Sequence, residues 1–117
     1  MTNQELNFKI AQLVYPNGTV SPLRRDGTEP EVIVHVNGNR VCGVINYCNN
    51  FNDLMPLIFE HGISFSDNYQ DGLFAATKWH YLGDATTFTS ARDKDPQIAL
   101  AECLLLVLQE KEKANAS

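Results

Sequence analysis

Cysteine and histidine are the side chains in this sequence that could bind a metal or form a nucleophilic site. There are three of each, namely Cys42, Cys48, Cys103, His35, His61 and His80. Structural zinc sites usually use closely spaced pairs of Cys or His, and Cys42 and Cys48 lie farther apart than such pairs do. The spacing therefore predicts no metal site, and no other cofactor is expected.

A nucleophilic cysteine would need a neighbouring base to activate it. For Cys48 the candidates are His61 or His80, with Asp53 to orient the base, but spacing along the chain does not show that these groups meet. The sequence contains no nucleophile elbow, phosphate loop, dinucleotide fingerprint or metalloprotease helix. An enzyme centred on Cys48 is therefore the less favoured interpretation, and no catalytic residue is assigned.

Short polar side chains follow Cys48, where a strand is expected to lead into a helix. Asn49 and Asn50 could bind an anion or a partner there, because backbone amides are free at the start of a helix. The same residues also cap helices and form turns. A structural role is the favoured interpretation, and partner binding is the alternative.

The segment Trp79-His80-Tyr81, preceded by Lys78, concentrates side chains that are useful in recognition. Trp and Tyr are enriched at the energetic centres of protein interfaces and can also stack on unpaired bases. A Trp at the end of a strand can equally fill the edge of a core. Both core packing and partner contact are therefore kept for this segment.

Charge argues against a general affinity for nucleic acid. Nine Lys and Arg residues against fourteen Asp and Glu residues give a net charge of -5, which repels phosphate unless the basic residues gather on one face. Arg24 and Arg25 are the adjacent basic pair, in a segment with the composition of an exposed loop. A solvated turn is expected there, with a phosphate or carboxylate contact as the minority interpretation.

The chain is predicted to be a single α+β domain over residues 1–117. A capping box formed by Thr2 and Glu5 should begin a helix that ends near 14, followed by an irregular loop to Pro30. Residues 31–36 and 41–45 have the composition of a β-hairpin, and further strands are expected near 63–65 and 74–79. Residues 86–89 have β propensity but few neighbours that define a strand.

Two further helices complete the prediction. A middle helix should begin with Asn52 or Asp53 as its cap, carry Pro56 in its first turn and end at Gly62. A C-terminal helix should begin at Asp95-Pro96 and run to about Lys111, with a polar tail from about 112. We expect a small, mainly antiparallel sheet, with the C-terminal helix buried against it.

The C-terminal helix is apolar on most of its surface, so leaving it bare would be costly. The sheet, other helices or a second subunit must cover it, which makes a homodimer through this helix a candidate. Its apolar run, 98–108, is too short to span a membrane. The start of the chain predicts no secretory leader, and the odd number of cysteines fits a reducing cytoplasm.

Two blocks of the chain resemble the NinX-like family of phage and prophage proteins. They are Tyr47-Cys48-Asn49-Asn50 running into Asn52-Asp53-Leu54-Met55-Pro56-Leu57, and Asp95-Pro96-Gln97-Ile98-Ala99-Leu100-Ala101-Glu102-Cys103-Leu104. The resemblance implies a product of a phage or prophage accessory gene, and it carries over no catalytic residue or cofactor.

We therefore expect a non-enzymatic accessory protein that contacts an unknown host or phage protein in the host cytoplasm. The candidate contact residues are Cys48, Asn49, Asn50, Trp79, His80, Tyr81, Arg24 and Arg25. The alternative is a nucleic-acid-binding accessory factor that uses Arg24, Arg25, Lys78 and Trp79.

Overall fold

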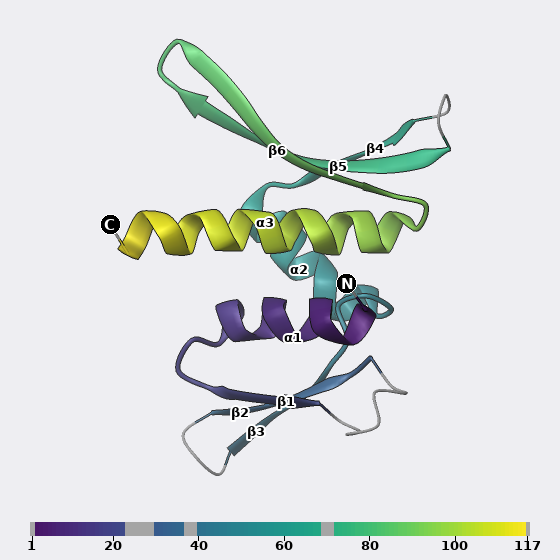
Figure 1. Cartoon of the computed structure of the whole chain (residues 1–117), viewed down its shortest axis with the longest axis vertical. Helices are drawn as coiled ribbons and strands as arrows, with labels where there is room; N and C mark the ends of the chain where they lie inside the picture. The colour runs from purple at the N-terminus through teal and green to yellow at the C-terminus, as the bar shows by residue number, and fades with distance from the viewer. Residues whose placement is uncertain (1, 23–29, 37–39, 69–71, 117) are drawn as a thin grey trace.

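The fold places a layer of helices between two antiparallel sheets of three strands each (Figure 1). The computed structural model describes residues 2–22, 30–36, 40–68 and 72–116. In chain order the elements are α1 (Asn3–Val14), β1 (Thr19–Pro22), β2 (Val32–Val36), β3 (Arg40–Ile45), α2 (Phe51–His61), β4 (Ser64–Asn68), β5 (Leu73–Leu82), β6 (Ala85–Asp93) and α3 (Pro96–Ala116). The predicted α+β class and the three helix positions are confirmed.

The strands divide between two sheets, whereas the sequence predicted one. The sheet β1-β2-β3 packs on α1, and the sheet β4-β5-β6 packs on α3, while α1 and α3 lie against each other (Figure 1). Each sheet buries one face, as shown by Val32 and Val34 in the first and Ala76 in the second. Two sheets can pack on the helices because both α1 and α3 contribute apolar side chains to the core. Ile10 of α1 and Leu104 of α3 are both fully buried.

Local capping explains where α1 and α3 begin. Thr2 accepts a hydrogen bond from the Glu5 amide at 3.1 Å, which is the predicted hydroxyl half of a capping box. Asp95 Oδ1 accepts from the Gln97 amide at 2.9 Å, and Pro96 occupies the first helical position. α3 continues to Ala116, beyond the predicted end near Lys111, because the polar residues there are good helix formers and include no breaker.

The start of α2 differs from the prediction. Asn50, not Asn52 or Asp53, is the cap, and its side chain accepts from the Asn52 amide at 3.0 Å. Pro56 consequently lies inside the helix and not in its first turn. Asp53 is instead used outside the helix, where it accepts from the Asn46 amide at 3.0 Å. The predicted stop is confirmed, because Gly62 adopts a left-handed conformation with φ of 65°.

Two strand assignments were incomplete. Residues 19–22, predicted to be irregular loop, form β1 and pair with β2, so that Pro22 lies opposite Val32. β1 is an edge strand, where proline is tolerated because its missing amide can face away from the ladder. Residues 86–89 belong to the long strand β6, and the Gly83-Asp84 segment is a tight turn closed by Leu82 and Ala85.

Within the described ranges, no helix combines the length and the apolarity needed to cross a membrane.

Candidate functional site

A buried polar network fixes the segment that leads from β3 into α2. Asn7 of α1 donates through Nδ2 to the Pro30 carbonyl at 2.8 Å and to Asn46 Oδ1 at 3.0 Å. Its Oδ1 accepts from the amides of Tyr47 at 2.8 Å and Cys48 at 3.2 Å. One fully buried side chain therefore holds α1, the segment just before β2 and the β3–α2 connection together.

The candidate residues after Tyr47 are used within this network. Gln97 of α3 donates to the Tyr47 carbonyl at 3.1 Å, and the Asn49 amide donates to Asn46 Oδ1 at 3.1 Å. The Asn50 side chain caps α2. These contacts position α2 on α3, and the side chains of Asn49 and Asn50 themselves lie at the surface.

Cys48 is buried and poorly suited to act as a nucleophile. Its Sγ lies 3.6 Å from the Asn3 carbonyl, to which it donates. Burial raises the pKa of the Cys48 thiol to about 12, and the carboxylates of Asp95 and Glu102 raise it further in the same direction. Because the thiolate is the reactive form of cysteine, this environment opposes the enzyme interpretation centred on Cys48.

The two proposed bases for Cys48 have other partners. His61 Nδ1 lies 2.9 Å from Lys111 Nζ, and burial followed by the Lys111 charge lowers the pKa of His61. His80 Nε2 lies 2.9 Å from Thr89 Oγ1. In the part of the chain that the structure describes, no group of three or more His, Cys, Asp or Glu residues could hold a metal. The side chain of Cys42 lies outside that part.

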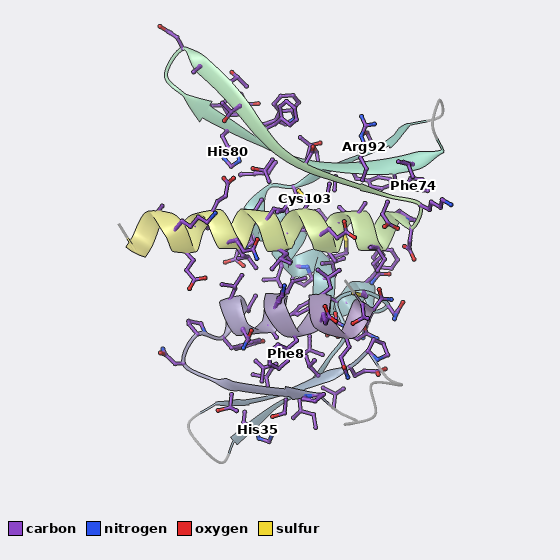
Figure 2. All side chains as sticks on the ribbon, in the orientation of Figure 1. Phe8, His35, Phe74, His80, Arg92 and Cys103 are labelled. Atoms are coloured by element: carbon purple, nitrogen blue, oxygen red, sulfur yellow. The ribbon has the colours of Figure 1, made fainter. Side chains whose placement is uncertain are left out.

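Trp79 and Tyr81 lie on the outer face of the β5–β6 hairpin, away from α3. Trp79 is 46% exposed and Tyr81 is 76% exposed. The indole of Trp79 packs on its cross-strand partner Phe88, with ring centroids 5.4 Å apart. His80 alternates to the other face, which Figure 2 shows turned toward α3. The sequence segment 79–81 therefore does not form one surface, because neighbours in a strand point in opposite directions.

Lys78 also lies on the inner face, apart from Trp79. A Cβ added to Gly62 would be 3.1 Å from Lys78 Nζ, so this ammonium group reaches the end of α2. The other basic candidates, Arg24 and Arg25, lie outside the described residues. Lys78 and Trp79, which were predicted to contact nucleic acid together, therefore lie on opposite faces of the sheet.

An apolar groove of about 560 Å³ lies between α2, the β4–β5 strands and the start of α3. The described residues that line it are all apolar: Phe51, Met55, Ile58, Phe59, Ile63, Phe65, Phe74, Pro96 and Leu100. Phe59 is 77% exposed, and Phe51 and Phe65 are about half exposed. We call this feature the α2 groove.

Two elements supply the aromatic walls of the α2 groove. Phe51, Met55 and Phe59 recur every four residues along α2 and so lie on one side of the helix. The rings of Phe65 and Phe74, on adjacent strands, stack with centroids 5.6 Å apart. The groove is therefore formed by regular elements and not by loops.

The α2 groove was not predicted, although the sequence of α2 contains a pattern that indicates it. α2 buries Leu54 and Ile58 in the core, which accounts for one apolar stripe. Phe51, Met55 and Phe59 form a second stripe that a single buried face does not require. An additional apolar stripe of this kind indicates a second contact surface.

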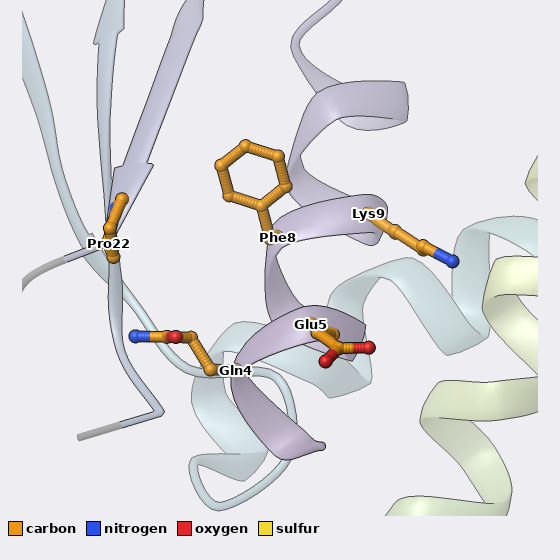
Figure 3. Close-up of a pocket in the computed structure, with 5 residues that line it drawn as sticks. All are labelled: Gln4, Glu5, Phe8, Lys9 and Pro22. Carbon is orange, nitrogen blue, oxygen red and sulfur yellow. The ribbon is translucent and has the colours of Figure 1, made fainter. Parts of the chain in front are cut away.

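A smaller hollow of about 180 Å³ lies between α1 and β1. In Figure 3, Phe8 and Gln4 extend from α1 toward the strand that carries Pro22, whereas the ends of Glu5 and Lys9 point away from it. Its charged groups do not converge, so this hollow is not a comparable candidate site.

Comparisons with protein-family models, with curated proteins and with solved structures gave no match to this chain.

Proposed function

We propose that this protein is a non-enzymatic phage or prophage accessory protein that binds a host or phage protein in the host cytoplasm. The phage origin and the compartment rest on the sequence resemblance to the NinX-like family. The binding role is supported above all by the α2 groove, with Phe59 exposed at its rim. Large exposed apolar patches on soluble domains mark interaction surfaces.

The proposed occupant of the α2 groove is the apolar face of an amphipathic helix in the partner protein. The groove is within the size range of small-molecule sites, but the described residues that line it offer no polar side chain to orient a small ligand. Helix-in-groove recognition needs only apolar anchors at helical spacing. Asp93, Lys94 and Asp95 precede Pro96 at the α3 end of the groove, and the two carboxylates there accept hydrogen bonds from backbone amides, so apolar contact and not charge would select the partner.

The test compares Phe59→Asp with Val44→Asp, a matched control on the exposed outer face of the other sheet. The dye 8-anilinonaphthalene-1-sulfonate should fluoresce with the native protein, and Phe59→Asp should remove most of this signal while Val44→Asp preserves it. A partner recovered from host lysate after nuclease treatment should then bind Phe59→Asp at least about tenfold more weakly in calorimetry.

Two results would overturn the proposal. One is equal binding of the purified partner by wild type and Phe59→Asp. The other is turnover of a substrate by the pure protein that is lost on substitution of Cys48 or His80.

Nucleic-acid binding is the second candidate, favoured by the exposed face of the β5–β6 hairpin. Trp79, Phe88 and Arg92 share this face by strand register, and Figure 2 shows Arg92 projecting from it. Stacking of single-stranded bases on such aromatic side chains would be assisted by a nearby cation. A labelled single-stranded oligonucleotide should then bind wild type, bind Trp79→Ala less tightly, and dissociate steeply as salt rises. Absence of binding at low salt would eliminate this candidate.

A further inference from the structure

The outer edge of β6 is the least protected sheet edge in the described structure. β1 has four residues and contains Pro22, and β4 has five residues and contains Asp67. The pairing of β3 with β2 shifts register between Val34 and His35, and β3 carries Gly43 at φ of 135°. Short length, proline, charge and bulges are the devices by which proteins block edge-to-edge pairing.

β6 has none of these devices along most of its length. It has nine residues in regular register with β5, and the segment from Ala85 to Ala91 has neither charge nor proline. The segment is rich in Thr with a central Phe, a composition that favours strands. Its side chains are largely exposed, and no described strand pairs with its outer side.

The hairpin turn determines which backbone groups of β6 point outward. Leu82 and Ala85 close a two-residue turn, so they form a hydrogen-bonded pair, and such pairs then recur at every second residue. Ala85, Thr87 and Thr89 consequently bond inward to β5. The amides and carbonyls of Thr86, Phe88 and Ser90 point toward the open edge.

We propose that β6 pairs antiparallel with β6 of a second copy of this chain, with the two-fold axis at Phe88. This register places Phe88 opposite Phe88 of the second copy and Thr86 opposite Ser90, so every outward group meets an outward group. Residues opposite each other in such a pair exchange both hydrogen bonds. The result is a continuous sheet of six strands across the dimer.

A second copy fits this edge better than an unrelated strand does. An antiparallel pair of identical strands satisfies the symmetry of an isologous dimer without further adjustment. The uncharged segment contributes no like-charge contact between two chains that each carry a net charge of -5. Side chains opposite each other share a face, so the exposed Trp79–Phe88 pair of each copy would meet its equivalent on the outer face.

The expected dimer is weak. Pairing of one strand buries less than the roughly 800 Å² per partner of a standard stable interface. Dimerisation should therefore appear in the micromolar range and depend on concentration. This distinguishes the proposal from the candidate dimer through α3, most of whose apolar surface is covered within the chain by β5, β6, α1 and α2.

The test is the molar mass by light scattering or sedimentation between about 1 and about 500 µM. Wild type should rise from 13.1 kDa toward twice that mass. Ser90→Pro removes an outward amide without removing a bond to β5, and it should stay monomeric with an unchanged far-ultraviolet circular dichroism spectrum. Ser90→Val keeps the amide and should dimerise as wild type does. Monomeric wild type over the whole range, or dimerisation of folded Ser90→Pro, would overturn the proposal.

A cross-linking variant tests the register even if Ser90→Pro fails to fold. Opposite residues of a hydrogen-bonded pair have Cα atoms about 5.5 Å apart, within the range of a disulfide. In a Cys42→Ser background, Phe88→Cys should form a covalent dimer on mild oxidation, whereas Thr87→Cys, on the inner face, should not. Equal cross-linking of the two variants would contradict the register. These results are independent of Phe59, so they distinguish failure of this dimer from failure of the α2 groove.

Discussion

Asn7 shows how a single buried polar side chain can fix a connection between elements. It bonds to Pro30, Asn46, Tyr47 and Cys48, which lie far from it in sequence. Each bond satisfies a backbone or amide group that would otherwise be buried without a partner. The position of α2, and with it the α2 groove, depends on this residue.

Replacing Asn7 by Ala should lower the free energy of unfolding by about 3 kcal/mol, because several buried polar groups lose their partners at once. Urea denaturation followed by circular dichroism measures the change. Gln12→Ala, at an exposed position of the same helix, is the control and should change stability by less than about 0.5 kcal/mol. Equal effects of the two substitutions would show that the Asn7 network contributes little.

Cys48 should react slowly in the native protein. Burial raises the pKa of its thiol to about 12, so little thiolate forms near pH 8. Iodoacetamide labelling followed by mass spectrometry should modify Cys48 much more slowly in the folded protein than in urea. Native labelling as fast as that of the unfolded chain would contradict this prediction.

The same pKa shift has a consequence for stability. Between the ordinary thiol pKa and about 12, the unfolded chain loses the Cys48 proton while the folded chain retains it. Stability contributed by the buried neutral thiol is therefore present at lower pH and is lost as pH rises through this window. Burial raises the pKa of Cys103 to about 11, so Cys103 acts in the same direction.

At the scale of elements, α3 is the helix on which both sides of the fold depend. Its residues contact β5, β6, α1 and α2, and Leu104 is fully buried while Leu106 is 39% exposed. A helix with a single apolar stripe could pack against neighbouring elements on one side only. The nearly continuous apolar surface of α3 explains why it can be covered on opposite sides by a sheet and by another helix.

Leu104→Ala should lower the free energy of unfolding by roughly 2–5 kcal/mol, because it removes buried methyl groups and leaves a cavity. Leu106→Ala changes the same residue type on the same helix and should cost about 1 kcal/mol or less. Thermal and urea denaturation of both variants check the ranking. A larger loss for Leu106→Ala would mean that this exposed residue is covered in the native assembly.

Helix termini were more predictable than strand pairing. The Thr2 and Asp95 caps depend on side chains next to each helix start, and the Gly62 stop depends on a left-handed backbone conformation that glycine adopts readily. Asn50 was missed as the cap of α2 because several adjacent residues could serve, and the Asn46–Asp53 contact engages one of them. β1 was missed because its pairing with β2 involves residues distant in sequence.

At the scale of the whole molecule, the two sheets at opposite ends of the helix layer give an extended shape. The principal extents are 47 × 36 × 22 Å, and the radius of gyration is 15.0 Å, compared with about 13 Å for a compact chain of this length. This arrangement leaves an outer face on each sheet, the α2 groove and the edge of β6 available for contact. The two proposed contacts use the α2 groove and the edge of β6, and not the buried faces of the central helices.

The sequence by itself determined the α+β class, the caps of α1 and α3, the β2–β3 hairpin and the burial of α3, because these follow from short-range bonds and apolar periodicity. Tertiary structure alone decided the division into two sheets, the exposure of Trp79, the inward direction of Lys78 and the existence of the α2 groove. Those features depend on which element covers which face. Local sequence shows that a side chain is apolar, but only the packing of distant elements determines whether it is covered.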